Sequence, residues 1–238
     1  MVSERMTMVL ALLDRTSTPH DIGGLSHLAS AAASTVLGVD GISAGVGTGP
    51  GGVALAWGGE IVGTRLENQQ FTLGEGPGVD AVTSGAPVLV ADLADVRARW
   101  PAFVQAAAEL GVRAVFAFPL RIGAISVGTM LAHRLSAGPL EAGQVVDALA
   151  LADVVTIALL DRSSVEIGAE DRAPTGWAAP VTYRAEVHQA TGMVSVQLGV
   201  SLAQALVRLR AHAWAEDCLL ADVAADVVAR RLRFDPDL

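Results

Sequence analysis

Residues 183–232 read YRAEVHQATGMVSVQLGVSLAQALVRLRAHAWAEDCLLADVAADVVARRL, and their apolar side chains recur at helical spacing in three successive segments. The spacing predicts helices over 183–198, 201–214 and 219–232. The aligned apolar residues are Val187, Ala190, Val194 and Leu198, then Leu202, Ala205, Leu206, Leu209 and Ala213, then Leu220, Val223, Ala224, Val227 and Val228. Because the connections are short, consecutive helices must pack as neighbours.

The ends of these segments carry recognisable signals. Gly199 is a helix stop, and Ser201 is a natural N-cap for the second helix. No Glu stands three residues after Ser201, so a complete capping box is not expected.

This stretch resembles the ANTAR domain, an RNA-binding module of bacterial antitermination regulators. The matching runs are 188–193 (HQATGM), 199–201 (GVS) and 220–224 (LADVA), together with Ala205, Leu209, Arg210, Ala213, Val227 and Val228. The resemblance implies recognition of small RNA hairpin loops, whose unpaired bases a protein can read. The family usually carries a basic residue at the place of Thr191, so Thr191 offers a hydrogen bond there without a charge.

Donors for phosphate and base edges are spread over all three predicted helices. The candidate RNA contacts are Arg184, His188, Gln189 and Thr191 on the first, Arg208, Arg210 and His212 on the second, and Arg230 and Arg231 at the end of the third. Residues 184, 188 and 191 share a helix face by spacing. An Arg cluster at a helix C-terminus also simply complements the helix dipole, and both histidines fit equally as ordinary surface residues, so these alternatives stay open.

The chain before this module mixes helix and strand patterns. We expect a domain over 5–162, a linker over 163–180 that loses the apolar periodicity, and the helical domain over 181–238. The predicted elements are helices over 4–14 and 21–37, strands over 41–46, 53–57 and 60–65, a helix from Pro77, a strand over 88–90, a helix over 101–110, strands over 114–120 and 124–131, and a helix over 140–160.

The runs 72–78 (TLGEGPG), 87–92 (PVLVAD) and 111–120 (GVRAVFAFPL) resemble a GAF domain, a sensor fold with an antiparallel sheet and a pocket on one face. The expected fold class is therefore α+β: a GAF-like antiparallel sheet with flanking helices, followed by an all-α three-helix ANTAR-like module. The resemblance implies an unknown small-molecule ligand such as a cyclic nucleotide, without selecting one, and no cofactor is expected. The pocket would be lined from Trp57, Phe71, Phe116 and Phe118, which are equally well explained as plain core.

Glycines 74, 76 and 78 stand immediately before and within the start of a predicted helix. Such a helix N-terminus favours anions, but no phosphate-loop Lys follows, so a turn that needs glycine for its dihedral angles is the favoured interpretation.

Composition limits the function. The net charge of −9 argues against a protein that grips nucleic acid over its whole surface, although residues 181–238 carry only −1 (six Arg, seven acids). All 16 basic residues are Arg, which agrees with the actinobacterial setting in which GAF and ANTAR domains are commonly joined. Cys218 is the only cysteine, so no disulfide or thiolate zinc site is expected within one chain, and Cys218 is expected to fill apolar space.

The scattered His residues and the lack of a recognisable catalytic arrangement indicate that the protein is not an enzyme and holds no metal. Asp147 and Asp153 interrupt the apolar run 145–160, and no signal peptide precedes it, so a cytoplasmic protein without membrane contact is expected. Helix 140–160 either pairs with its copy in a homodimer, through residues such as Leu149 and Val155, or is buried within one chain.

We therefore expect an RNA-binding transcription regulator that acts by antitermination on tandem hairpins, under the control of its sensor domain. The alternative is a ligand-sensing dimeric adaptor whose helical module binds a protein partner rather than RNA.

Overall fold

The computed structural model describes residues 2–15, 22–47, 53–58, 61–166, 178–216 and 218–235. The chain divides into two compact units, one made of residues 1–47 and 55–172 and the other mainly of residues 173–238. Each unit has its own buried core, and each is described by itself below.

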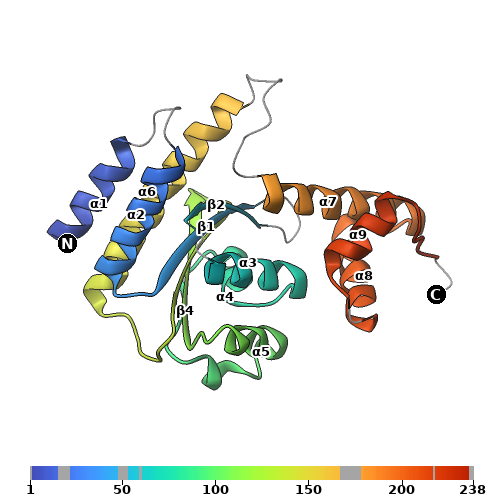
Figure 1. Ribbon diagram of the computed structural model, residues 1–238, viewed down its shortest axis with the longest axis horizontal. Helices are drawn as coiled ribbons and strands as arrows, with labels where there is room; N and C mark the ends of the chain where they lie inside the picture. The colour runs from blue at the N-terminus through green and yellow to red at the C-terminus, as the bar shows by residue number, and fades with distance from the viewer. Residues whose placement is uncertain are drawn as a thin grey trace. The chain divides into compact units, whose positions relative to one another are not determined.

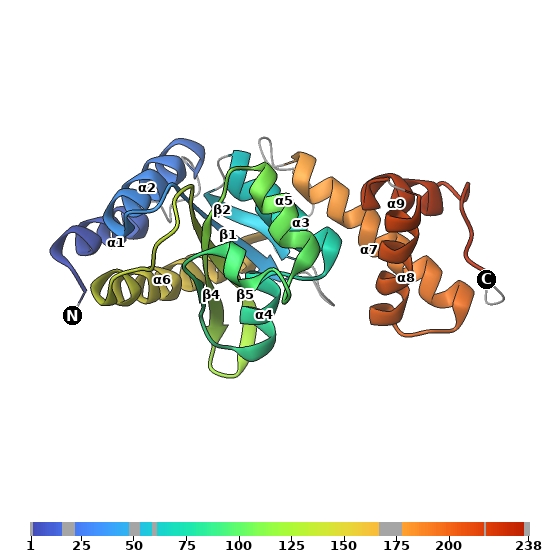
Figure 2. The ribbon, with the colours of Figure 1, turned by 90° about the horizontal axis from the view of Figure 1, so that it is seen from below.

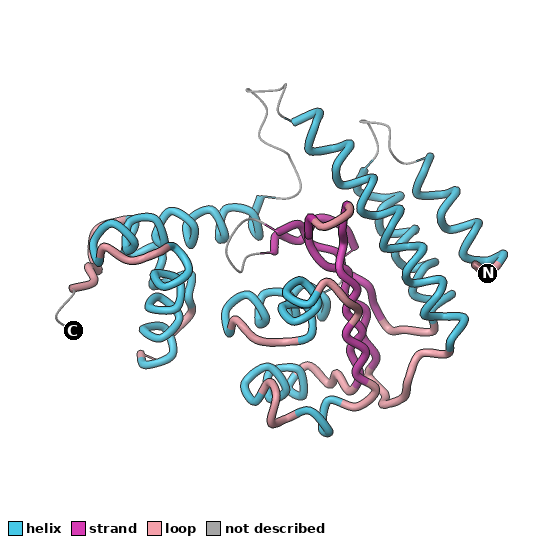
Figure 3. The backbone as a smooth tube through the Cα atoms, turned by 180° about the vertical axis from the view of Figure 1, so that it is seen from behind, coloured by secondary structure: helices cyan, strands magenta, loops and turns pink. Residues whose placement is uncertain are grey.

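The first unit is built on a five-stranded sheet that lies between two layers of helices (Figures 1 and 3). The strands are β1 (Gly41–Gly47), β2 (Val53–Gly58), β3 (Val88–Val90), β4 (Ala114–Ile122) and β5 (Ile125–Arg134). Their order in the sheet is β2-β1-β5-β4-β3, and β5 pairs antiparallel with β1 and β4, while β4 pairs antiparallel with β3. The expected α+β class with an antiparallel sheet is confirmed.

Each face of the sheet carries its own helices. One face packs against α1 (Glu4–Arg15), α2 (Ile22–Leu37) and α6 (Ala142–Glu166), and the other against α3 (Ile61–Leu73), α4 (Pro77–Ser84) and α5 (Pro101–Glu109), with a 3-10 turn η1 (Leu93–Val96) before α5. Alternation along β4 divides its side chains between the faces: Phe116 and Phe118 face α6, whereas Val115 and Ala117 face α4 and α5.

Helix α6 is a core helix of this unit. Its residues 142–159 are long and apolar enough to cross a membrane by composition. In the fold, Leu151, Ala152 and Val155 are instead buried against the sheet and α2. The Asp147 carboxylate is also buried and accepts hydrogen bonds from the backbone N–H of Ser3 (2.7 Å) and from its hydroxyl (2.6 Å), which holds the start of α1 against α6. The face predicted for self-pairing is therefore largely occupied within the chain, although Leu149 remains 41% exposed.

One element in this unit was predicted wrongly. Residues 60–65 were expected to form a strand, but α3 begins at Ile61. Its buried residues are Gly63, Leu66, Glu67, Gln70 and Phe71, which is helical spacing. Two of the five are polar, and a pattern of apolar residues alone misses a helix that buries polar side chains.

The second unit consists, in its described part, of α7 (Ala178–Leu198), α8 (Leu202–Ala215) and α9 (Leu220–Val228), packed on one another (Figure 2). Their buried side chains are Val187, Ala190, Thr191 and Val194 on α7, Ala205, Leu206, Leu209 and Ala213 on α8, and Leu220, Val223, Ala224 and Val227 on α9.

The turn between α7 and α8 is stabilised at both sides. Gly199 adopts a positive φ of 65°, and the axes of residues 186–198 and of α8 differ by 105°. The Ser201 hydroxyl accepts a hydrogen bond from the Gln204 N–H, and the Gln204 carboxamide oxygen accepts one from the Ser201 N–H, so a capping box is present. The expectation that none would form was wrong, because Gln can replace Glu at this position. Cys218 is exposed rather than filling apolar space.

Candidate functional sites

Four polar side chains are buried between α3 and the sheet of the first unit. They are Ser43 on β1, Glu67 and Gln70 on α3, and Thr129 on β5, each no more than 3% exposed. The side chain of Thr129 lies on the α3 face because it is two residues before Leu131, which belongs to that core. None of these four residues is among the predicted functional residues, because the sequence pattern predicts a strand over 60–65 and no helix over Glu67 and Gln70.

The cluster leaves hydrogen-bonding capacity unused. The Ser43 hydroxyl donates to Glu67 Oε1 (3.3 Å), and the Gly78 N–H donates to Gln70 Oε1 (2.6 Å). Among the described residues, neither Gln70 Nε2 nor Thr129 Oγ1 has a partner. His133 Nδ1 is a third buried atom of this unit without a partner among the described residues. Since buried polar groups are nearly always satisfied, Gln70 Nε2 and Thr129 Oγ1 mark a place where a polar ligand or ordered water would bind.

Glycines let the backbone come close to this cluster. A Cβ added at Gly63 would lie 3.3 Å from the Ser43 Cβ, a tight contact that would require Ser43 to shift by a few tenths of an ångström. A Cβ at Gly78 would lie 3.0 Å from Gln70 Oε1. The glycine run 74–78 thus serves the turn and the seating of Gln70, and one amide at the start of α4 is already occupied by a carboxamide rather than free for an anion.

The same turn also holds α5. Glu75 Oε1 accepts hydrogen bonds from the N–H groups of Ala102 (2.8 Å) and Phe103 (2.9 Å), which are the first free donors of that helix. The turn between α3 and α4 therefore connects two caps: its Gly78 N–H donates to Gln70 of α3, and its Glu75 caps α5.

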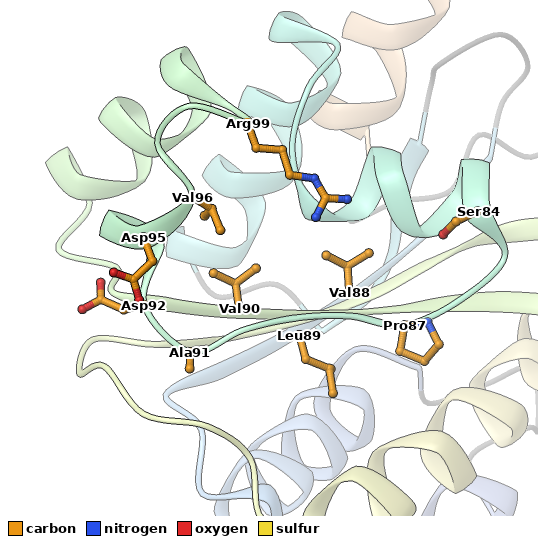
Figure 4. Close-up of a pocket in the computed structure, with 10 residues that line it drawn as sticks. All are labelled: Ser84, Pro87, Val88, Leu89, Val90, Ala91, Asp92, Asp95, Val96 and Arg99. Atoms are coloured by element: carbon orange, nitrogen blue, oxygen red, sulfur yellow. The ribbon is translucent and has the colours of Figure 1, made fainter.

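A pocket of about 470 Å³ lies beside β3 and η1, and its lining runs from Ser84 at the end of α4 to Arg99 (Figure 4). Figure 4 shows Val88 and Val90 on the same side of β3 as Arg99, whereas Leu89 points to the opposite side. Most charges here are paired within the chain: Arg99 binds Asp80 (2.6 Å), and Arg113 binds Asp92 (2.7 Å), which lowers the pKa of the Asp92 carboxyl and raises that of Arg113.

The aromatic pocket expected from the sequence does not form as a unit. Phe116 and Phe118 are fully buried on the face covered by α1, α2 and α6, whereas Phe71 is on α3 and covers the opposite face. The side chain of Trp57 lies outside the described residues. The expectation failed because alternate residues of a strand point to the same face. Phe116 and Phe118 therefore share one face of β4, and that face is part of the main core.

The candidate RNA contacts of the second unit differ in accessibility. Gln189, Arg208 and Arg230 are exposed, and His188 and Arg210 are half-buried. Arg231 is exposed but bound to Asp226 (2.6 Å), and the His212 ring packs edge-on against Phe234 (centroids 5.4 Å apart). The side chain of Arg184 lies outside the described residues.

Thr191 is not on the surface. It is 6% exposed, and its hydroxyl donates to the Val187 carbonyl of its own helix (2.6 Å). The sequence predicts an RNA surface on the helix face shared by residues 184, 188 and 191. In the structure, Thr191 instead belongs to the buried side of α7, together with Val187, Ala190 and Val194. Thr191 is therefore withdrawn from the candidate contacts.

Within the part of the chain that the structure describes, no group of three or more His, Cys, Asp or Glu side chains is placed to hold a metal ion. His133 on β5 is buried beside Asp40; burial lowers the pKa of its imidazole, and the Asp40 carboxylate opposes that shift only in part.

No protein-family model and no curated protein matches the chain. Solved structures do. The GAF domain of a phosphoenolpyruvate-protein phosphotransferase from Coxiella burnetii is 15% identical, with a TM-score of 0.51, covering 69% of this chain and 99% of that one. The GAF domain of the Acinetobacter phosphoenolpyruvate-protein phosphotransferase is 10% identical, with a TM-score of 0.51, covering 69% and 99%.

A third match is the free methionine-R-sulfoxide reductase of Neisseria meningitidis, solved in complex with its substrate. It is 17% identical, with a TM-score of 0.51, and covers 68% of this chain and 90% of that one. At such identities the likeness shows the fold alone: the α+β unit has a GAF-like fold. Since one protein with this fold is an enzyme, the fold by itself does not decide whether the unit catalyses a reaction.

Proposed function

We propose that the chain is a cytoplasmic regulator of transcription antitermination, in which the GAF-like unit senses a small molecule and the three-helix unit binds hairpin loops in nascent RNA. The protein acts by binding rather than by catalysis. The resemblance of residues 181–238 to ANTAR domains supplies the RNA part of this proposal, and the GAF-like fold supplies the sensing part.

The observation that carries the sensing part is the pair of unsatisfied buried atoms, Gln70 Nε2 and Thr129 Oγ1. They lie on the face of the sheet that α3, α4 and α5 cover, and Glu67 and Ser43 add a carboxylate and a hydroxyl there. A neutral or cationic ligand with hydrogen-bond acceptors for Gln70 and Thr129 suits this set. Such a ligand would stabilise the unit in proportion to its concentration over its dissociation constant.

Thermal unfolding of the full chain with the neutral nucleosides adenosine or guanosine tests this part, since both present many hydrogen-bond acceptors. We expect a ligand-dependent rise in Tm that the Gln70→Met variant loses. Gln105→Met is the matched control, because Gln105 is exposed on α5. A rise in Tm that Gln70→Met retains would move the ligand away from the buried cluster.

For RNA binding, the probe is a pool of transcripts that carry two tandem hairpins with randomised loops. We expect the wild-type protein to enrich particular loops. The logarithm of its binding constant should fall linearly with the logarithm of the salt concentration. Arg208→Ala should reduce the salt slope by about one, as for the loss of one phosphate contact. Arg5→Ala, an exposed Arg on α1, should change nothing. Failure to enrich any RNA would refute the RNA function.

A dimer would give the protein two RNA modules, and linked sites raise avidity without new contacts. The α6 side chains Val146, Leu149 and Ile157 are 38%, 41% and 60% exposed, and we propose that they pair with a second copy. Asp153 lies one turn from both Leu149 and Ile157, so it belongs to the same face of α6. Sedimentation of the wild type and of Ile157→Asp checks this: a monomeric wild type would exclude it.

The second candidate is an adaptor whose helical unit binds a protein partner. Exposed apolar side chains on that unit favour it, namely Val196 (85%) and Leu219 (67%). Salt separates the two candidates, because an apolar protein interface would not weaken steeply as salt rises.

A further inference from the structure

Helix α8 differs from its neighbours in charge. Its sequence LAQALVRLRAHAWA contains Arg208 and Arg210 but no Asp or Glu. The acids of the other two helices are Glu186 on α7, and Asp222 and Asp226 on α9. Glu216 follows directly as the C-cap of α8 and is exposed. Within the three described helices, α8 is thus the one whose charge suits a polyanion.

One exposed side of α8 carries small and apolar side chains. Ala203, Val207, Ala211 and Trp214 recur at helical spacing and are all exposed, whereas Ala205, Leu206, Leu209 and Ala213 form the buried side. Trp214 is 74% exposed and Val207 59%. A single exposed Leu or Val is unremarkable, but an indole that exposes three quarters of its surface is uncommon in a folded unit.

We infer that Trp214 is a base-stacking residue, on which an unpaired base of the bound hairpin loop lies, while Arg210 contacts a neighbouring phosphate and Arg208, on another side of α8, contacts the RNA backbone elsewhere. This inference rests on the proposed RNA binding and names the residue that reads the loop. Aromatic rings stack on bases of every kind, and splayed loop bases are the usual partners. Arg210 precedes Trp214 by four residues and so lies on the same side of α8.

RNA fits this side of α8 better than a protein partner. A helix that docks in a protein groove presents large apolar anchors at i, i+3, i+4 and i+7. Here two of the four positions are alanines, so Val207 and Trp214 are the only large apolar side chains of this set. An acid-free helix with two Arg residues also favours a phosphate backbone over an average protein surface.

The test uses the full chain and the tandem-hairpin RNA enriched by the wild type. Trp214→Ala should weaken binding by about 5- to 150-fold, the loss measured for one stacked base, with the salt slope unchanged. Trp214→Phe, which keeps an aromatic face, should restore most of the affinity. Val207→Ala on the same stripe is the control and should bind as the wild type does. Circular dichroism checks folding, and Trp214 is exposed enough that no core packing is lost.

The outcomes distinguish the stacking role of Trp214 from RNA binding by the protein as a whole. RNA bound equally by the wild type and Trp214→Ala, with Arg208→Ala weakened, would overturn the stacking role and leave RNA binding intact. Unchanged RNA affinity together with a change from dimer to monomer in Trp214→Ala would assign this side of α8 to self-association and overturn the inference. Failure of the wild type to enrich any RNA would remove the proposed function and this inference with it.

Discussion

The contact between Asp147 and the N-terminal helix gives the sharpest stability prediction. Asp147→Ala removes a buried carboxylate that accepts two hydrogen bonds from Ser3 at 2.7 and 2.6 Å. A hydrogen bond to a charged group contributes about 1.5–3 kcal/mol net. We take the lower value for both bonds, because the start of α1 can fray and let water reach Ser3. The expected loss is therefore about 3 kcal/mol, or roughly 6–12 °C in Tm for a unit of this size.

The matched control is Glu109→Ala at the end of α5, because Glu109 is exposed and lies outside the α6 face. Its expected effect is within about 0.5 kcal/mol. Trypsin reads out the mechanism directly, because α1 carries Arg5 and ends at Arg15. Cleavage at these two sites should be faster in Asp147→Ala than in the control. Equal Tm values and equal cleavage rates for the two variants would refute the idea that Asp147 holds α1.

Three further predictions follow from single contacts. Thr191→Val should change the unfolding free energy by less than about 1 kcal/mol and leave RNA affinity unchanged, since the hydroxyl serves only its own helix; weaker RNA binding would return Thr191 to the interface. Ser201→Ala should destabilise the second unit by about 1 kcal/mol in thermal unfolding through the loss of its cap, whereas Ser136→Ala in an exposed loop should not. The lowered pKa of His133 means that the unfolded chain takes up its proton first as pH falls below 6.5, so stability is complete above that pH and declines toward the lower folded pKa; His133→Leu should flatten this decline in urea titrations, and an unchanged slope would exclude His133 as its cause.

The sequence predicted the elements that obey a simple period. Strands β4 and β5 and helix α8 carry long apolar patterns with clear ends, and the structure places them within a few residues of the expected bounds. Residues 60–65 failed for a physical reason. Six residues of mixed polarity fit a strand, and only the burial of Glu67 and Gln70 further along shows that the segment is helical.

The candidate ligand site was out of reach for the same reason. Burial of Gln70 and Thr129 depends on which layer covers which face of the sheet, and no local pattern states this. Phe116 and Phe118 show the converse error: aromatic residues were assigned to a pocket, whereas the strand alternation sends both into the main core. For Thr191, spacing identified a shared helix face correctly but not which way that face points.

The turn at residues 74–78 has a consequence for how the GAF-like unit opens. Gln70 of α3 accepts from Gly78 in this turn, and Glu75 of the same turn holds the first turn of α5, so the contacts that hold both helices meet at residues 74–78. The amide protons of the two helices should therefore exchange with solvent in one cooperative opening rather than separately. A molecule that engaged Gln70 would slow exchange in α5 as well, at a distance from any atom it touches.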